Sequence, residues 1–142
     1  MELYSGVVLQ ARKPYFYANL GVPDTPDGRY DMIMIHAFLL LHRLKRDLPS
    51  TEKISQALFD VMFEDMDESL REMGAGDVGI GRRVKEMAKA FYGRIAVYDE
   101  GLSRDDDSLD IALRRNVYRQ SNAEDEQIRA LGCYMRRGAA YL

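Results

Sequence analysis

The chain has 142 residues, which suits one domain, and its 46% hydrophobic and 30% charged content is ordinary for a globular protein. The formal net charge of −3 gives no overall positive field to attract nucleic acid, so we expect no specific DNA partner. The single cysteine, Cys133, excludes an intramolecular disulfide and a metal site built from cysteines.

The N-terminal third of the chain predicts two helices joined by a loop. Apolar residues recur at helical spacing over 2–20, and Pro14 should kink or split this helix, because proline lacks an amide donor and clashes with the preceding turn. Thr25 followed by Pro26 is typical of a helix N-cap. The helix that follows runs to about Asp47, and its apolar side chains cover most of its circumference, which predicts a position at the centre of a bundle.

The rest of the chain predicts four more helices and no strand. Apolar stripes with spacings of three and four mark each helix, whereas no stretch alternates apolar and polar residues for long enough to favour a strand. The sequence therefore predicts an all-α fold, with residues 1–142 forming a single compact bundle of about six helices around a central hydrophobic helix. The predicted stripes and spans of these four helices are about 54–73, 84–98, 105–119 and 123–142.

The histidines lack the spacing of a metal site. Di-iron bundles use Glu-x-x-His pairs on facing helices, but Ile33 and Leu39 stand three positions before His36 and His42. The two histidines are six residues apart and do not share a helix face. We interpret His36 as a partly buried, hydrogen-bonded side chain of the central helix.

Three other patterns also have a structural explanation. Asp60, Glu64 and Asp67 form a ridge that could bind a cation or a basic partner, but exposed carboxylates are the default on a helix surface. Cys133 lies in a mainly apolar stretch, which favours a buried structural thiol. The glycines between 74 and 81 are similar to a phosphate-binding loop, yet no strand precedes them, and helix-turn glycines explain them better. We expect no metal, no cofactor and no enzymatic activity.

Methionine and aromatic residues are predicted mainly to fill the core. Met32, Met34, Met62, Met66, Met73 and Met87 fall in the three central helices, where a few of them could line a groove for a client helix. The aromatic side chains predicted to anchor packing near helix ends are Phe16, Tyr17, Phe91 and Tyr92.

Four segments that occur in order along the chain carry a resemblance to a known family. The segments are 10–25 (QARKPYFYANLGVPDT), 27–33 (DGRYDMI), a set of short stretches between 56 and 77 that includes QALFD and LREMG, and 91–94 (FYGR) with Tyr98. On these residues the chain resembles the ubiquinol–cytochrome c chaperone family over about residues 3–120, and more loosely to its end.

The resemblance implies an all-helical chaperone, without a cofactor, for assembly of the ubiquinol–cytochrome c reductase complex, respiratory complex III. In mitochondria, members of the family act with a small helper protein at the ribosomal exit and receive newly made cytochrome b. The implied partners are therefore cytochrome b as the client, the ribosome and a small helper protein. The resemblance also allows a peripheral contact of the chain with the inner membrane. The alternative is a non-enzymatic helical adaptor that docks on membrane lipid or on the assembled complex.

The start of the chain bears on localisation. It has neither a secretory h-region nor an Arg- and Ser-rich transit peptide, and no segment reaches the about 20 apolar residues of a membrane-spanning helix. Together with the resemblance, this favours an alphaproteobacterial protein in the cytoplasm, or peripheral to the bacterial inner membrane. Because a helical face begins at once, we expect that a native leader has been trimmed or that a short one never existed.

The sequence points to a partner surface at one end of a helical hairpin. The segment 63–77 joins an acidic ridge to a glycine-rich turn, and basic residues follow immediately, so that opposite charges meet there. An intramolecular network that holds the hairpin explains Arg71 and Asp77 individually at least as well. We predict that the partner surface includes Asp65, Arg71, Asp77, Arg82, Arg83 and Lys85.

Overall fold

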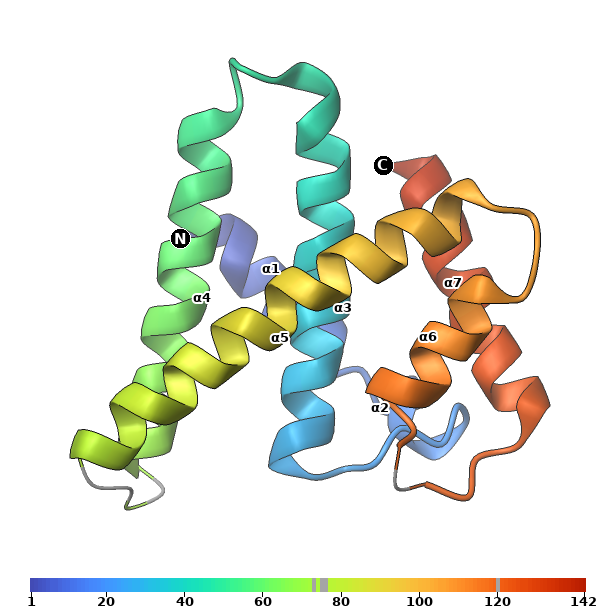
Figure 1. The fold of residues 1–142 in the computed structure, drawn as a ribbon, viewed down its shortest axis with the longest axis horizontal. Helices are drawn as coiled ribbons and strands as arrows, with labels where there is room; N and C mark the ends of the chain where they lie inside the picture. Colours follow the sequence, from blue (N-terminus) through green and yellow to red (C-terminus); the bar gives the residue numbers. More distant parts are fainter. Residues whose placement is uncertain (73, 75–76, 120) are drawn as a thin grey trace.

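The computed structural model describes residues 1–72, 74, 77–119 and 121–142, apart from the side chains of residues 77 and 78. These residues form seven α-helices and one short 3₁₀ helix, without a strand, so the described part of the chain is all-helical, as the sequence predicts (Figure 1). The elements are α1 (Glu2–Ala11), α2 (Pro14–Ala18), α3 (Pro26–Leu44), η1 (Lys45–Asp47), α4 (Glu52–Glu72), α5 (Asp77–Ser103), α6 (Ser108–Asn116) and α7 (Asp125–Tyr141).

Helix α3 is the centre of the bundle. Its N-terminus is fixed by Pro26 in the first turn and by the Gly28 amide, which donates a hydrogen bond to Thr25 Oγ1 at 3.1 Å. Every residue of the range Asp31–Leu39 is buried. Helices α1, α4, α5 and α7 all pack against α3, and the prediction of a central hydrophobic helix is confirmed (Figure 1).

Proline divides the first predicted helix into two. Helix α1 ends at Ala11, and Pro14 occupies the first position of α2, where its missing amide donor costs no helical hydrogen bond. The hydroxyl of Tyr17 in α2 donates to the Ala11 carbonyl at 2.9 Å. This bond satisfies a carbonyl at the end of α1 and holds the two helices at their bend.

Helices α4 and α5 form a hairpin, and α5 crosses α3 before it reaches α6 and α7 (Figure 1). The buried side chains of α4 recur every four residues, at Leu58, Met62, Met66 and Leu70. Ile54 was predicted to belong to the same stripe but is exposed, because the first turn of α4 projects beyond the core.

The acidic run before α6 lies outside the helix, although the sequence predicts a helix from about residue 105. The Ser108 amide donates to Asp106 Oδ1 at 2.9 Å, so that an acid of the run binds the start of α6 from outside. The hydrogen bonds from Ser108, supported by Arg104, lower the pKa of Asp106 to about 2. The preceding helix extends to Ser103, five residues beyond the predicted Tyr98.

Most, but not all, of the residues predicted to be structural are buried. Phe16, Phe91 and four of the predicted methionines are buried, Tyr17 and Met87 are half-buried, and residue 73 lies outside the described residues. The prediction of a buried thiol at Cys133 is wrong: this residue is exposed, because it lies two positions from Leu131 and therefore nearly opposite the buried face of α7. Tyr92 is 58% exposed, although its ring stacks on that of Phe59 with the centroids 5.5 Å apart.

Of the helices that the structure describes, none combines the length and the apolar character that crossing a bilayer requires.

Phe91 and Tyr92 form a matched pair for testing this packing. We expect Phe91→Ala to lower the free energy of unfolding by about 3–5 kcal/mol, because the ring is fully buried and its removal leaves a cavity. Tyr92→Ala should lower the free energy by less than about 1.5 kcal/mol, since most of that ring is already in water. Urea unfolding followed by circular dichroism measures both values, and equal losses would contradict the packing described here.

Candidate functional site

The basic residues predicted for the partner surface lie on α4 and α5, on both sides of the turn that joins them. Arg71 is exposed in the last turn of α4 and donates from Nε to Asp67 Oδ1 at 3.1 Å. Arg82, Arg83 and Lys85 are exposed in the first turns of α5. We call these three residues of α5, together with Arg71, the basic corner.

The two acids predicted for the same surface have different positions. Asp77 begins α5, but its side chain lies outside the described residues. Asp65 is half-buried on α4, and the Tyr4 hydroxyl of α1 donates to its Oδ2 at 2.5 Å. Burial, and secondarily Asp65, raise the pKa of Tyr4, so the phenol keeps the proton that it donates. Asp65 therefore takes part in the contact between α1 and α4.

The acidic ridge of α4 fits a solvated helix face. Asp60 and Glu64 are exposed, and Gln56 Nε2 donates to Asp60 Oδ1 at 2.9 Å within the same helix. Across residues 1–72, 74, 77–119 and 121–142, no group of three or more His, Cys, Asp or Glu side chains is arranged to hold a metal ion.

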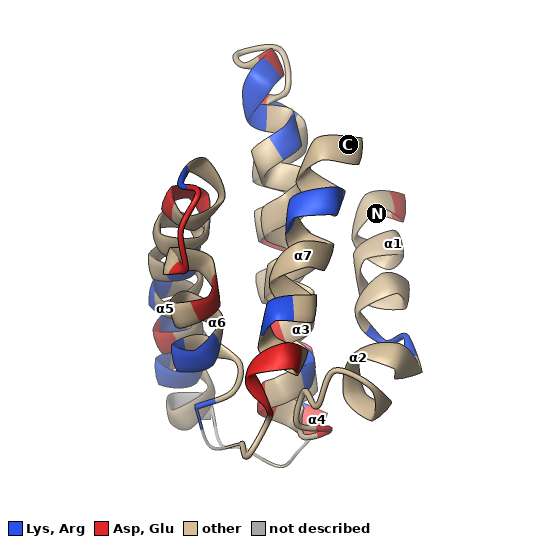
Figure 2. Cartoon of the chain, turned by 90° about the vertical axis from the view of Figure 1, so that its right-hand side faces the viewer, with Lys and Arg blue, Asp and Glu red and all other residues tan. Residues whose placement is uncertain are grey.

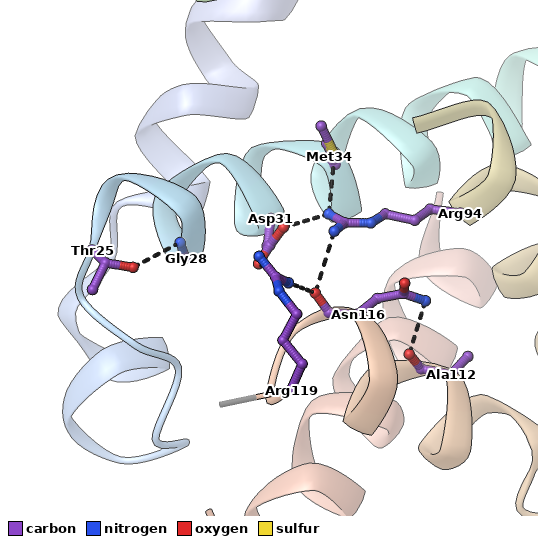
Figure 3. A network of polar contacts seen from close by, with 8 residues as sticks. All are labelled: Thr25, Gly28, Asp31, Met34, Arg94, Ala112, Asn116 and Arg119. Carbon is purple, nitrogen blue, oxygen red and sulfur yellow. Dashed lines mark hydrogen bonds and ion pairs between the residues drawn. The ribbon is translucent and has the colours of Figure 1, made fainter. Parts of the chain in front are cut away.

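Asp31, a charge inside the central helix, is bound by two arginines (Figure 3). Arg94 Nη1 of α5 donates to Asp31 Oδ1, and Arg119 Nη1, beyond the end of α6, donates to Asp31 Oδ2 at 3.2 Å. The side chains of Asp31 and Arg94 are only 5% and 11% exposed. Burial raises the pKa of Asp31, while the two guanidinium charges act in the opposite direction.

The same arginines also bind the end of α6. Arg94 Nη2 donates to the Asn116 carbonyl at 3.3 Å, and Arg119 Nη1 donates to the same oxygen (Figure 3). This carbonyl lies at the negative end of the α6 dipole, where cations are favoured. The ion network therefore fastens α5 and α6 to the N-terminal half of α3. In the sequence, the ion network is indicated by Asp31, a single acid in an apolar run. Such an acid implies a buried cationic partner but does not identify which residue that partner is.

An apolar groove of about 700 Å³ lies between α1, α3 and α7. Helices α1 and α7 flank α3, and the two chain ends lie at the same end of the groove (Figure 2). Sequence reasoning missed this groove, because its three sides come from segments far apart in the chain. Its main lining residues are Leu3, Gly6, Val7 and Gln10 of α1, His36, Leu39 and Leu40 of α3, and Tyr134, Arg137, Gly138, Tyr141 and Leu142 at the C-terminus.

A chain of hydrogen bonds closes one end of the groove. Because the Met32 carbonyl can only accept, His36 Nδ1 donates to it at 2.8 Å, which leaves Nε2 to accept from the Tyr134 hydroxyl at 2.7 Å. Gln10 Nε2 donates to the Tyr134 oxygen at 3.1 Å. Burial lowers the pKa of His36, so the ring stays neutral in this arrangement. His36 is therefore a buried, hydrogen-bonded side chain, as the sequence predicts.

Comparison with known proteins gives matches in both sequence and structure. The family model described as "Ubiquinol-cytochrome C chaperone" matches residues 18–142. The ubiquinol-cytochrome c reductase complex assembly factor 1 of Mus musculus is 26% identical over 142 residues, which cover 100% of this chain and 48% of the mouse protein. Protein CBP3, mitochondrial, of Saccharomyces cerevisiae is 31% identical over 121 residues, which cover 81% of this chain and 35% of the yeast protein.

The fold matches a solved structure. The crystal structure of the Cbp3 homolog from Brucella abortus superposes with a TM-score of 0.83 and 41% sequence identity, covering 94% of this chain and 74% of that chain. The present chain spans about half the length of its mouse relative.

The ion network yields a stability prediction. We expect Asp31→Asn to lower the free energy of unfolding by about 3–5 kcal/mol, because it leaves the buried Arg94 without its anionic partner. The control is Asp47→Asn in the exposed Arg43–Asp47 pair, which should cost at most about 1 kcal/mol. Chemical denaturation of the two variants provides the comparison, and a similar small loss in both would contradict the structural role of Asp31.

The neutral His36 yields a pH prediction. Unfolded histidine binds a proton near pH 6.5, whereas folded His36 does so only at lower pH, so the unfolded chain holds more protons in between. The contribution of His36 to stability is complete above about pH 6.5 and is lost as the pH falls toward the folded pKa, with a slope of up to about 1.4 kcal/mol per pH unit. Unfolding free energies measured between pH 7 and pH 5 should lose this slope in His36→Gln and keep it in His42→Gln. An unchanged slope in His36→Gln would refute the assignment.

Proposed function

This chain belongs to the ubiquinol-cytochrome C chaperone family, and from this premise we propose that it is a non-enzymatic assembly chaperone for the ubiquinol–cytochrome c reductase complex. The observation that carries the proposal is the match to the family over residues 18–142, which include every helix from α3 onward. The client is newly made cytochrome b, an apolar subunit that must be held before assembly. The protein works on the cytoplasmic side of a bacterial inner membrane, in peripheral contact with it.

The basic corner supports a second contact of the chaperone. Arg82, Arg83 and Lys85 are exposed within about one turn of one another, just beyond the first turn of α5. A cation cluster in this position is not needed to stabilise its own helix. It suits an acidic partner, such as ribosomal RNA at the exit or a small acidic helper protein.

The function is tested by deleting the gene from an alphaproteobacterial strain and restoring it on a plasmid. The expected result is loss of cytochrome b absorbance and of ubiquinol–cytochrome c reductase activity, both recovered with the plasmid copy. Crosslinking during a short radioactive pulse should capture newly made cytochrome b on the protein. A passive adaptor would instead be captured only with the assembled complex, and normal complex levels in the deletion strain would refute the proposed function.

The basic corner has its own test in the same strain. Arg82→Glu combined with Lys85→Glu should lower accumulated cytochrome b while changing the free energy of unfolding by less than about 1 kcal/mol, because both side chains are exposed. The control is Lys53→Glu, an exposed residue at the opposite end of the α4–α5 hairpin, which should leave cytochrome b normal. Normal cytochrome b with the double variant would exclude the basic corner as a partner surface.

A further inference from the structure

We propose that the groove between α1, α3 and α7 binds one apolar α-helical segment of the membrane-protein client, about two turns long. This inference rests on the proposed function, because it names the part of the molecule that holds the client. The basic corner lies on other elements and takes no part in it.

The groove lies between two helices that pack against the same central helix. Helices α1 and α7 each pack against α3 but make few contacts with each other (Figure 2). The groove has residues of α3 as its floor. It is bridged at one end by the Gln10–Tyr134 hydrogen bond. The α1 wall of the groove is about 10 Å long from Leu3 to Gln10, which is the length of two turns of a bound helix.

Glycines in both walls of the groove allow the backbone of a bound helix to come close. Gly6 lies in the α1 wall, and a Cβ atom added to it would have no neighbour within 4 Å. Gly138 is in the facing α7 wall, where only Leu39 comes near such an atom. Small residues on facing walls let the backbone of another helix come close, which is how apolar helices associate in the absence of polar contacts.

The charges and hydrogen bonds of the groove favour an apolar helix over other occupants. Its charged lining residues, Glu2 and Arg137, have opposite signs, so the groove offers no net charge to an ionic ligand. The Tyr134 hydroxyl is bonded to both Gln10 and His36, and the second ring nitrogen of His36 is bonded to the Met32 carbonyl. An extended peptide would leave backbone amides unpaired against apolar walls, whereas a helix satisfies its own amides.

The open end of the groove carries exposed apolar side chains. Leu3 and Leu142 are exposed there, and Tyr141 is 91% exposed. Apolar side chains that gather at the mouth of an apolar groove mark a surface that a partner covers. An apolar client helix would bury these side chains together with the groove walls.

The test uses a fluorescein-labelled peptide of about 20 residues, rich in Leu and Ala with Lys pairs at both ends, which has the length of a membrane-spanning helix. Fluorescence anisotropy should show binding to the full chain. A Cβ atom at position 6 meets no neighbour within 4 Å, and leucine has a higher helix propensity than glycine. Gly6→Leu should therefore occupy the groove, bind the peptide about tenfold or more weakly and melt no earlier than the unmodified protein. The matched control is Gly93→Leu on the exposed face of α5, which also has no neighbour within 4 Å and should bind normally.

Two further measurements define the occupant. The same peptide with two central prolines should bind weakly, because it cannot form a continuous helix, and equal binding of both peptides would overturn the helix assignment. Lauric acid binding that Gly6→Leu abolishes, without peptide binding, would instead make the groove an acyl-chain site. A dimer of this chain that Gly6→Leu dissociates in analytical ultracentrifugation would make the occupant a second copy; either result overturns the proposal.

The deletion strain separates this inference from the proposed function. If the unmodified gene restores cytochrome b and Gly6→Leu does not, while Gly93→Leu does, both proposals are supported. If both glycine variants restore cytochrome b fully, the function stands and the groove is not the client site. If the deletion strain has normal cytochrome b, the proposed function fails, and the peptide measurements alone decide what the groove binds.

Discussion

The structure depends on the burial of α3 along nearly its whole circumference. No residue of the range Asp31–Leu39 is left to water, so neighbouring helices must cover every side of this segment. Helices α1, α4, α5 and α7 do so, and their own apolar stripes face inward as a result. The break at Pro14 also helps to bury α3, because α2 turns away from α1 and places Phe16 against the ring of His36.

The one carboxylate inside this buried segment specifies how the outer helices are placed. Asp31 must be paired, and in the described part of the chain its cationic partners are Arg94 and Arg119. A buried ion pair adds little net stability compared with apolar packing, but it tolerates few alternative arrangements. Here it fixes the middle of α5 and the end of α6 at one position along α3, which apolar contacts alone would leave less strictly defined.

The two candidate binding surfaces lie on different elements and differ in chemistry. The basic corner is at the α4–α5 turn, away from the chain ends, whereas the groove opens at the chain ends between α1 and α7 (Figures 1 and 2). A groove without net charge holds an apolar segment by apolar contact and can release it when the segment finds its place in a complex. A charged corner can hold a second partner at the same time, since neither surface covers the other.

The sequence by itself determined the helices, the centre of the bundle and the family, because these depend on local periodicity, on capping residues such as Thr25, and on motifs read in order. It also indicated that His36 would be buried and bonded. The exposure of Ile54 was decided by how far the neighbouring helices cover α4, which its spacing from Leu58 does not state. The exposure of Cys133 follows from its spacing from Leu131, and the apolar residues around it in the sequence pointed the other way. The partners of Asp31, the bond from Tyr4 to Asp65, and the groove were decided by tertiary structure alone, because each joins segments more than 60 residues apart.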